Sequence, residues 1–140
     1  MKPSFREIDH SGDVGIEAWG ANPAKALESA TRGLFSLMVH DPGKVLPRVE
    51  RSIAVDAPGD GDMVVDWLSE VITAASTHGE IYGAVEIRQT GPHSVRGVIG
   101  GESIDEARHG LRFEVKAATY HGLAIDSPDG SCRIRVIFDL

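Results

Sequence analysis

The sequence predicts a single α+β domain over residues 1–140, with two helices packed on a largely antiparallel or mixed β-sheet. Three observations indicate this class. Apolar residues recur at intervals of three and four in two separate stretches, as they do on one face of a helix. Elsewhere apolar and polar residues alternate in short runs, which is the pattern of half-buried strands. Turn-forming residues separate those runs, and a length of 140 residues suits one compact domain.

The N-terminal part of the chain indicates two strands followed by a helix. Residues 5–8 look short and extended, and residues 14–19 alternate with a period of two. Asn22 followed by Pro23 is typical of a helix start, because Asn caps the helix and Pro tolerates its first position. Apolar residues then recur along one face: Leu27, Ala30, Leu34, Leu37 and Met38. The turn residues Asp41-Pro42-Gly43 are expected to end this helix.

The middle of the chain indicates a third strand and the clearer of the two helices. Residues 49–55 alternate, with their apolar positions on one face. The aspartate-rich stretch 56–62 lacks the spacing of a calcium loop and is expected to lead into a helix, where acidic residues favour the N-terminus. Between residues 64 and 72 the apolar positions follow a helical period. Thr77-His78-Gly79 is expected to end that helix.

The C-terminal part of the chain is expected to be mostly strands. The glycine-bounded acidic stretch 100–110 is predicted to be a loop, and Gly91-Pro92 a turn. Cys132 falls with the apolar set of its strand, so we expect an inert core thiol. Strands are predicted in residues 85–88, 95–99, 111–117, 123–125 and 132–138.

Composition excludes several classes of protein. The formal net charge is −7 and the pI is near 5.3, which does not suit direct nucleic-acid binding and instead suits a cation or a basic protein partner. No segment has the roughly 18 apolar residues needed to span a bilayer, and we expect neither a membrane span nor a signal peptide. The one cysteine cannot form an internal disulfide, which fits a cytoplasmic protein.

Polar groups that could act chemically are densest in Asp9-His10-Ser11-Gly12-Asp13-Val14-Gly15. The sequence has no phosphate-binding P-loop and no zinc-binding motif, which leaves oxygen ligands. Asp13 begins one predicted strand, and Asp139 ends the last one beside the C-terminal carboxylate of Leu140. Strand ends that meet on one rim would offer carboxylates to a hard divalent cation. The alternative is that Asp13 stabilises a turn and Asp139 is simply solvated.

Other residues are weaker candidates for the same site. Asp9, Glu102 and Asp105 are secondary carboxylates. Lys116 lies on the polar face of its alternating run, as an ordinary exposed lysine or as a cation that faces a partner or an anionic ligand. Tyr120-His121 follows where that run ends, either as strand-end packing or as part of the Asp13 rim.

Read together, these stretches resemble the archease family. The motifs that carry the resemblance are Asp-His-Ser-Gly-Asp-Val-Gly at 9–15, Gly-Glu-x-x-Asp at 101–105, Val-Lys-Ala-Ala-Thr-Tyr-His at 115–121 and the terminal Phe-Asp-Leu. Asp-Trp-Leu-Ser-Glu at 66–70 also matches, and the resemblance covers essentially the whole chain. The family's usual Thr-Ala in the first motif is Ser-Gly here, which adds backbone freedom at Gly12.

The resemblance implies a function that the residues alone do not show. Archeases are protein cofactors of the RtcB-type RNA ligase, and they promote its guanylylation and multiple turnover in tRNA splicing and RNA repair. The family's metal site maps onto Asp13 and Asp139, with calcium as the first choice and magnesium or manganese as alternatives. Asp9 and His10 then have supporting roles, and the protein is not itself an enzyme. The competing readings are a stand-alone metal-dependent phosphohydrolase and a general interaction module.

Overall fold

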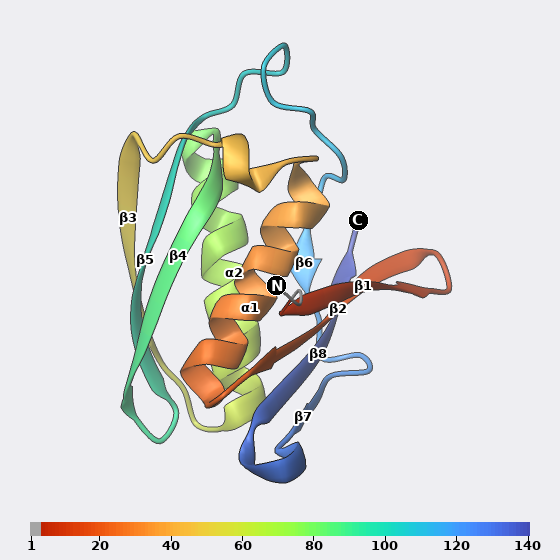
Figure 1. The fold of residues 1–140 in the computed structure, drawn as a ribbon, viewed down its shortest axis with the longest axis vertical. Helices are drawn as coiled ribbons and strands as arrows, with labels where there is room; N and C mark the ends of the chain where they lie inside the picture. The colour runs from red at the N-terminus through yellow and green to blue at the C-terminus, as the bar shows by residue number, and fades with distance from the viewer. Residues whose placement is uncertain (1–3) are drawn as a thin grey trace.

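Two antiparallel sheets enclose two helices, which lie between them as the middle layer of the molecule (Figure 1). The computed structural model describes residues 4–140. Residues 1–3, at the start of the predicted domain, and the side chain of His10, a predicted supporting residue, lie outside the described part.

The larger sheet is built from both ends of the chain. Its strands are β1 (Phe5–His10), β2 (Asp13–Gly20), β6 (Ala117–Ala118), β7 (Ala124–Asp126) and β8 (Cys132–Asp139). The order is β1-β2-β8, and β6 and β7 both pair with the remaining edge of β8. All of these pairings are antiparallel. The N-terminal hairpin therefore lies directly beside the last strand.

The smaller sheet comes from the middle of the chain. Its strands are β3 (Val49–Asp56), β4 (Glu80–Gly91) and β5 (Ser94–Ser103), with β5 in the centre. The free edge of β4 faces α1. There the buried carboxylate of Glu28 accepts the backbone N–H of Ile87 at 2.7 Å, which satisfies one edge donor.

The helices begin and end at residues whose chemistry explains their bounds. In α1 (Pro23–Met38) the Asn22 side chain accepts the backbone N–H of Lys25 at 2.9 Å. Helix α2 (Asp60–His78) stops at Gly79, whose φ of 63° is left-handed and suits glycine. Two short 3₁₀ turns complete the chain, η1 (Pro42–Lys44) and η2 (Pro128–Gly130). No described helix combines the length and the apolarity required to cross a membrane.

The core fills the space between the sheets. Its largest fully buried side chains include Trp67 of α2, Phe35 of α1 and Phe138 of β8. Gly33 of α1 lies against the side chain of Ile16 on β2, where a Cβ atom would come within 2.7 Å of it. The absence of a side chain at this position lets the helix approach the sheet closely.

The predicted α+β class is confirmed, with two differences in detail. The strands form two sheets, and each sheet carries the helices on one of its faces. The predicted loop 100–110 is shorter, because residues 100–103 continue β5. The predicted strand 111–117 is wrong over most of its length. The backbone N–H groups of Arg112 and Phe113 donate to carbonyls at the end of α1, so only residues 117–118 join the sheet.

Candidate functional site

Asp13 and Asp139 are neighbours on adjacent strands. The register of β2 and β8 pairs Val14 with Phe138, so the next residues outward on the two strands are Asp13 and Asp139. Residues opposite one another in an antiparallel pair have Cα atoms about 4.5–5.5 Å apart and point to the same face. The fold thus places a carboxylate from residue 13 beside one from residue 139, although 125 other residues separate them.

The third strand of this rim is β6. Ala117 pairs with Asp139, and the backbone N–H of Lys116 donates to the Asp139 carbonyl at 2.9 Å. A row of Asp13, Asp139 and Ala117 therefore crosses three strands on one face. The small Ala117 side chain leaves space beside the two carboxylates. Lys116 enters the same rim through its backbone, and its exposed ammonium has no ion pair with another described residue.

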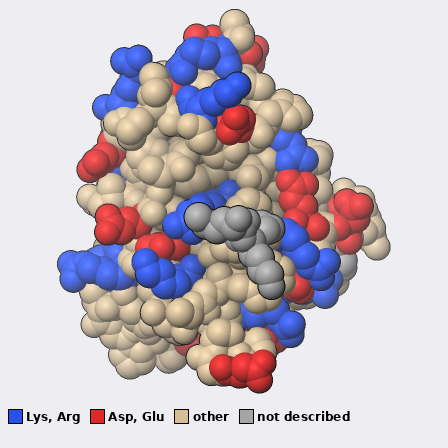
Figure 2. Space-filling view, viewed as in Figure 1, with Lys and Arg blue, Asp and Glu red and all other residues tan. Residues whose placement is uncertain are grey.

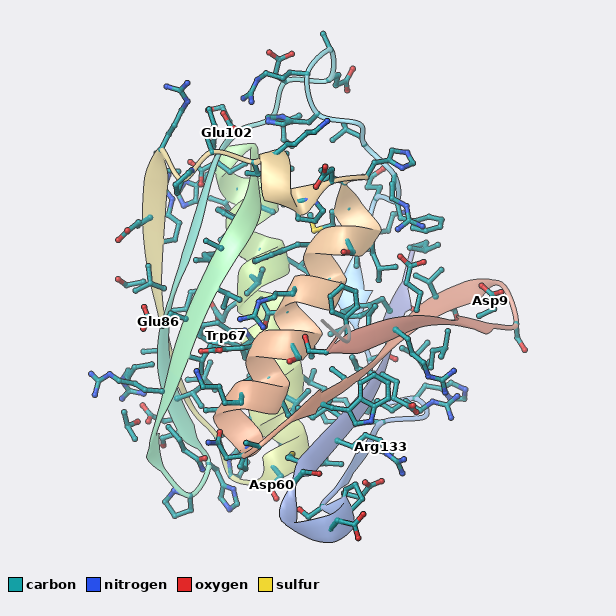
Figure 3. All side chains as sticks on the ribbon, viewed as in Figure 1. Asp9, Asp60, Trp67, Glu86, Glu102 and Arg133 are labelled. Atoms are coloured by element: carbon teal, nitrogen blue, oxygen red, sulfur yellow. The ribbon has the colours of Figure 1, made fainter. Side chains whose placement is uncertain are left out.

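The hairpin that carries Asp13 closes through a tight two-residue turn. Ser11 and Gly12 have positive φ values of 39° and 91°, as in turns that match the twist of paired strands. The turn brings His10 opposite Asp13 in register, and Asp9 opposite Val14. Figure 3 shows Asp9 on the projecting part of this hairpin, away from the core. Of the two residues predicted to support the site, Asp9 and His10, it is His10 whose backbone lies opposite Asp13.

The rim has too few carboxylates to bind a hard cation by themselves, so backbone carbonyls and water would have to complete the coordination. Among the described residues no three His, Cys, Asp or Glu side chains lie close enough to hold a metal ion. Asp13 and Asp139 offer two carboxylates, and Leu140, the third predicted ligand, follows Asp139 directly. Calcium takes six to eight oxygen ligands and accepts carbonyls and water among them. The donor set fits calcium, magnesium or manganese better than zinc.

Glu102 and Asp105 belong to a different part of the molecule. Glu102 is buried at the end of β5 and accepts hydrogen bonds from the guanidinium of Arg108, the backbone N–H of Leu46 and the imidazole of His109. These bonds lower the pKa of Glu102 to about 2, the Arg108 bond most strongly. The Asp105 side chain accepts the N–H of Ala107 within its own loop. Both carboxylates therefore stabilise the loop after β5 and do not lie beside Asp13.

His109 completes this network in one tautomer. Its Nδ1 accepts the backbone N–H of Asp105 at 3.0 Å, so Nε2 carries the proton that faces Glu102 at 3.1 Å. The sequence pattern does not reveal this buried cluster, because it predicts only an acidic loop over residues 100–110, with Glu102 and Asp105 as secondary carboxylates. The signal available was the mixture of Glu102, Arg108 and His109 in one short stretch between glycines.

Tyr120 and His121 lie in the connection between β6 and β7. This connection runs along the edge of β8 opposite to β2, so β8 separates it from Asp13. The Tyr120 hydroxyl donates to the carboxylate of Asp62 on α2 at 2.6 Å. That bond is the main cause that raises the pKa of Tyr120 to about 12. Tyr120 therefore ties the connection to α2.

Charged side chains are mixed on the face seen in Figure 2, where basic and acidic groups alternate over the surface. Several charged side chains of the described residues form ion pairs, such as Arg112 with Glu7 and Arg6 with Glu17. The face shown has no continuous basic stripe of the kind that follows a nucleic-acid backbone.

Comparison with known proteins gives one consistent result. Residues 5–140 match the model of the Archease protein family (MTH1598/TM1083). Two curated relatives named protein archease each align with 97% of this chain. That of Methanopyrus kandleri is 32% identical over 142 residues and is covered to 99%, and that of Thermococcus gammatolerans is 30% identical over 140 residues and is covered to 98%.

Solved structures agree with the fold. The solution structure of Methanobacterium thermoautotrophicum protein 1598 is 29% identical and has a TM-score of 0.80, with 99% of this chain and 100% of that chain covered. The crystal structure of a Thermotoga maritima protein, described as an archease and possible chaperone, has a TM-score of 0.64. It is 21% identical, with 100% of this chain and 98% of that chain covered, and at that identity the likeness concerns the fold.

Proposed function

Because the chain belongs to the archease family, we propose that it is a metal-binding protein cofactor of an RtcB-type RNA ligase. In this role it promotes guanylylation of the ligase, and so its multiple turnover, in tRNA splicing and RNA repair. The partner is a protein and not a nucleic acid, and the place of action is the cytoplasm. Membership of the family is shown by the comparisons, and the ligase as partner is what we propose in addition.

The observation that carries the proposal is the position of Asp13 and Asp139, which follow the Val14–Phe138 pair at the same end of two neighbouring strands. Two carboxylates side by side repel one another unless a cation or a proton lies between them. The β2–β8 register keeps Asp13 and Asp139 on the same face, since a shift of β2 by one residue would turn the Asp13 side chain to the opposite face. A rim that holds like charges together is suited to a divalent cation.

Each residue of the rim has its own part in the proposal. Asp13 and Asp139 hold the cation, and Leu140 contributes its terminal carboxylate. A bound divalent cation would supply positive charge that helps to orient nucleotide phosphates at the ligase. Lys116 is held beside the rim by the bond from its N–H to the Asp139 carbonyl. Its exposed ammonium, which has no ion pair with another described residue, faces the partner or a phosphate. His10 and Asp9 support the hairpin.

The charge of the whole chain agrees with a protein partner. A ligase that holds RNA needs a basic surface, and a chain with a net charge of −7 is complementary to such a surface. The buried Cys132, whose thiol pKa is raised chiefly by desolvation, fits a protein of a reducing compartment.

A ligation assay at limiting ligase tests the proposal. With RNA ends in excess, the ligase by itself should stop near one product per enzyme, and addition of this protein should give many turnovers. Equal product in both reactions would overturn the cofactor proposal. Hydrolysis of phosphoesters by the isolated protein would instead support the stand-alone enzyme.

Two variants connect the assay to the rim. Asp139→Asn should abolish both the stimulation and the binding of calcium measured by isothermal titration, because one of two paired carboxylates is lost. Asp129→Asn is the matched control, since Asp129 is an exposed aspartate in the η2 turn before β8 and has no part in the proposed site. If the two variants stimulate equally well, the metal part of the proposal is wrong.

A further inference from the structure

A cleft of about 580 Å³ runs along residues 111–116. One wall is this extended segment, and the other is the C-terminal half of α2, from Ile72 to Gly79. Ile81 of β4 and Ile104, in the loop that follows β5, also line it. Of the residues given a role at the Asp13 rim, Lys116 lines this cleft, whereas Asp13, Asp139 and Leu140 do not.

The cleft is lined by buried apolar side chains and by two large apolar side chains that are exposed. Ile72, Ile81 and Val115 line the cleft and are buried. Ile104 and Leu111 are 41% and 39% exposed, although both line the cleft. Single exposed apolar residues are common, but two that share one concave surface indicate a contact surface for another molecule.

Part of the backbone of this wall has no backbone hydrogen-bond partner among the described residues. In the described chain, the N–H groups of residues 114 and 115 make no backbone hydrogen bond, and no carbonyl of residues 111–115 accepts one from a backbone N–H. Unpaired backbone groups along an extended segment are the template for addition of another extended strand. A strand therefore suits this cleft better than a helix, whose backbone groups are already satisfied.

The charges at the mouth define what such a strand should carry. Glu106 and Glu114 are exposed, line the cleft, and have no ion pair with any described residue. Two other charged residues of the lining are already engaged, Arg112 with Glu7 and Glu80 with Arg51. The free charge on the cleft is thus acidic, except at Lys116, where the cleft reaches the Asp13 rim.

We propose that this cleft docks an extended segment of the RNA ligase that alternates apolar and basic residues. The apolar side chains would cover Ile104 and Leu111, and the basic ones would pair with Glu106 and Glu114. The inference rests on the proposed function, because it names the surface by which that partner is held. It separates two tasks: the cleft supplies affinity, and the rim at its Lys116 end supplies the activating groups.

A charge placed in the cleft tests the apolar part. Leu111→Glu should weaken binding of the ligase by about tenfold or more, as loss of an interface anchor does. Leu46→Glu is the matched control, since Leu46 is 42% exposed and does not line the cleft. Affinity is measured by isothermal titration of each folded variant into the ligase, with circular dichroism as the check of folding. Equal affinities for Leu111→Glu and wild type would overturn the inference.

Calcium binding and turnover distinguish this inference from the proposed function. Leu111→Glu should bind calcium as wild type does and should recover full stimulation at higher concentration. Asp139→Asn should keep its affinity for the ligase and lose stimulation. If wild type stimulates the ligase and Leu111→Glu has the same affinity, only the cleft assignment fails. If wild type neither binds nor stimulates the ligase, both proposals fail.

A charge reversal and a cross-link test the partner's chemistry. Glu114→Lys should weaken binding and reduce its dependence on salt, whereas Glu70→Lys, on the exposed face of α2, should not. A photoreactive maleimide on Leu111→Cys should cross-link to a ligase segment with alternating apolar and basic residues. Buried Cys132 is protected from the reagent. A cross-link to a helix, or to an acidic segment, would contradict the assigned occupant.

Discussion

The indole N–H of Trp67 donates a 2.9 Å hydrogen bond to the hydroxyl of Thr31, and that hydroxyl donates to the backbone carbonyl of Leu27 at 2.6 Å. Both side chains are fully buried, one on each helix. The bond therefore joins α1 to α2 in the middle layer, where an unpaired polar group would be costly. It fixes the relative position of the helices that carry both sheets.

Thr31→Val should lower the free energy of unfolding by about 1–3 kcal/mol, because the shape of the side chain is kept while the Trp67 N–H loses its acceptor. Urea denaturation followed by circular dichroism measures the change. Thr73→Val on the exposed surface of α2 is the control and should stay within about 0.5 kcal/mol of wild type. Equal stabilities of the two variants would show that the buried bond contributes nothing measurable.

Gly97→Ala should destabilise the protein strongly. A Cβ atom at Gly97 would lie 2.5 Å from Cη2 of the Trp67 ring and 2.7 Å from the carbonyl oxygen of Glu86, which is backbone and cannot move aside. Overpacking of this kind costs about 1–3 kcal/mol. Gly100→Ala is the matched control on the same strand, since its Cβ would meet neighbours at 3.5 Å or more. In thermal unfolding, Gly97→Ala should have a clearly lower midpoint temperature than Gly100→Ala. The opposite order would refute the packing argument.

The Glu102 network should make stability depend on pH in the acid range. The pKa of Glu102 is lowered from the ordinary 4.5 to about 2, and the hydrogen bond from Arg108 is the largest cause. The folded state thus favours the ionised form, and this contribution is complete above about pH 4.5 and is lost as the pH falls towards 2. Glu102→Gln should be much less stable than wild type at neutral pH and close to it near the folded pKa. Denaturation midpoints across this range measure the difference.

Glu106→Gln is the control for that series, because Glu106 is exposed and unpaired among the described residues. Its difference from wild type should be small at every pH. If the difference in stability between Glu102→Gln and wild type were also independent of pH, the buried network would add no pH-dependent stability.

The phenol of Tyr120 should lose its proton at a higher pH than an ordinary tyrosine. The chain has two tyrosines. The bond to Asp62 raises the pKa of Tyr120 to about 12, and burial raises that of Tyr82. Absorbance near 295 nm should therefore stay flat as the pH passes 10, the ordinary value. Asp62→Asn should make one tyrosine titrate earlier, whereas Asp66→Asn, which lacks the bond, should shift it less. Superimposed curves for wild type and Asp62→Asn would contradict the assignment.

Much of the fold follows from local patterns. The capping pair Asn22 and Pro23 begins α1 as predicted, and Gly79 ends α2 in the left-handed conformation. The alternation of residues 132–138 is confirmed as β8. These features could be predicted because a cap or a side-chain period depends on residues within a few positions of one another.

The candidate site could be predicted in part, for a less local reason. Asp13 and Asp139 stand at the ends of recognisable strands, and the resemblance to archeases indicates the same two residues. Their position side by side requires the β2–β8 register, which no short stretch encodes. The cleft beside Leu111 could not be predicted, since it exists only where residues 111–116 run past α2.

The sequence by itself determined the class, the helix bounds, most strand positions and the family, because these depend on periodicity, capping and motifs along the chain. Tertiary structure decided which strands share a sheet and which polar groups meet. Residues 111–117 alternate like a strand, yet the amides of Arg112 and Phe113 bond to the end of α1 and leave the segment as the wall of a cleft. Glu102 likewise looks like a loop carboxylate, and only burial beside Arg108 and His109 makes it structural. Contacts between residues far apart in the chain depend on how all the elements pack together, and no local pattern records that packing.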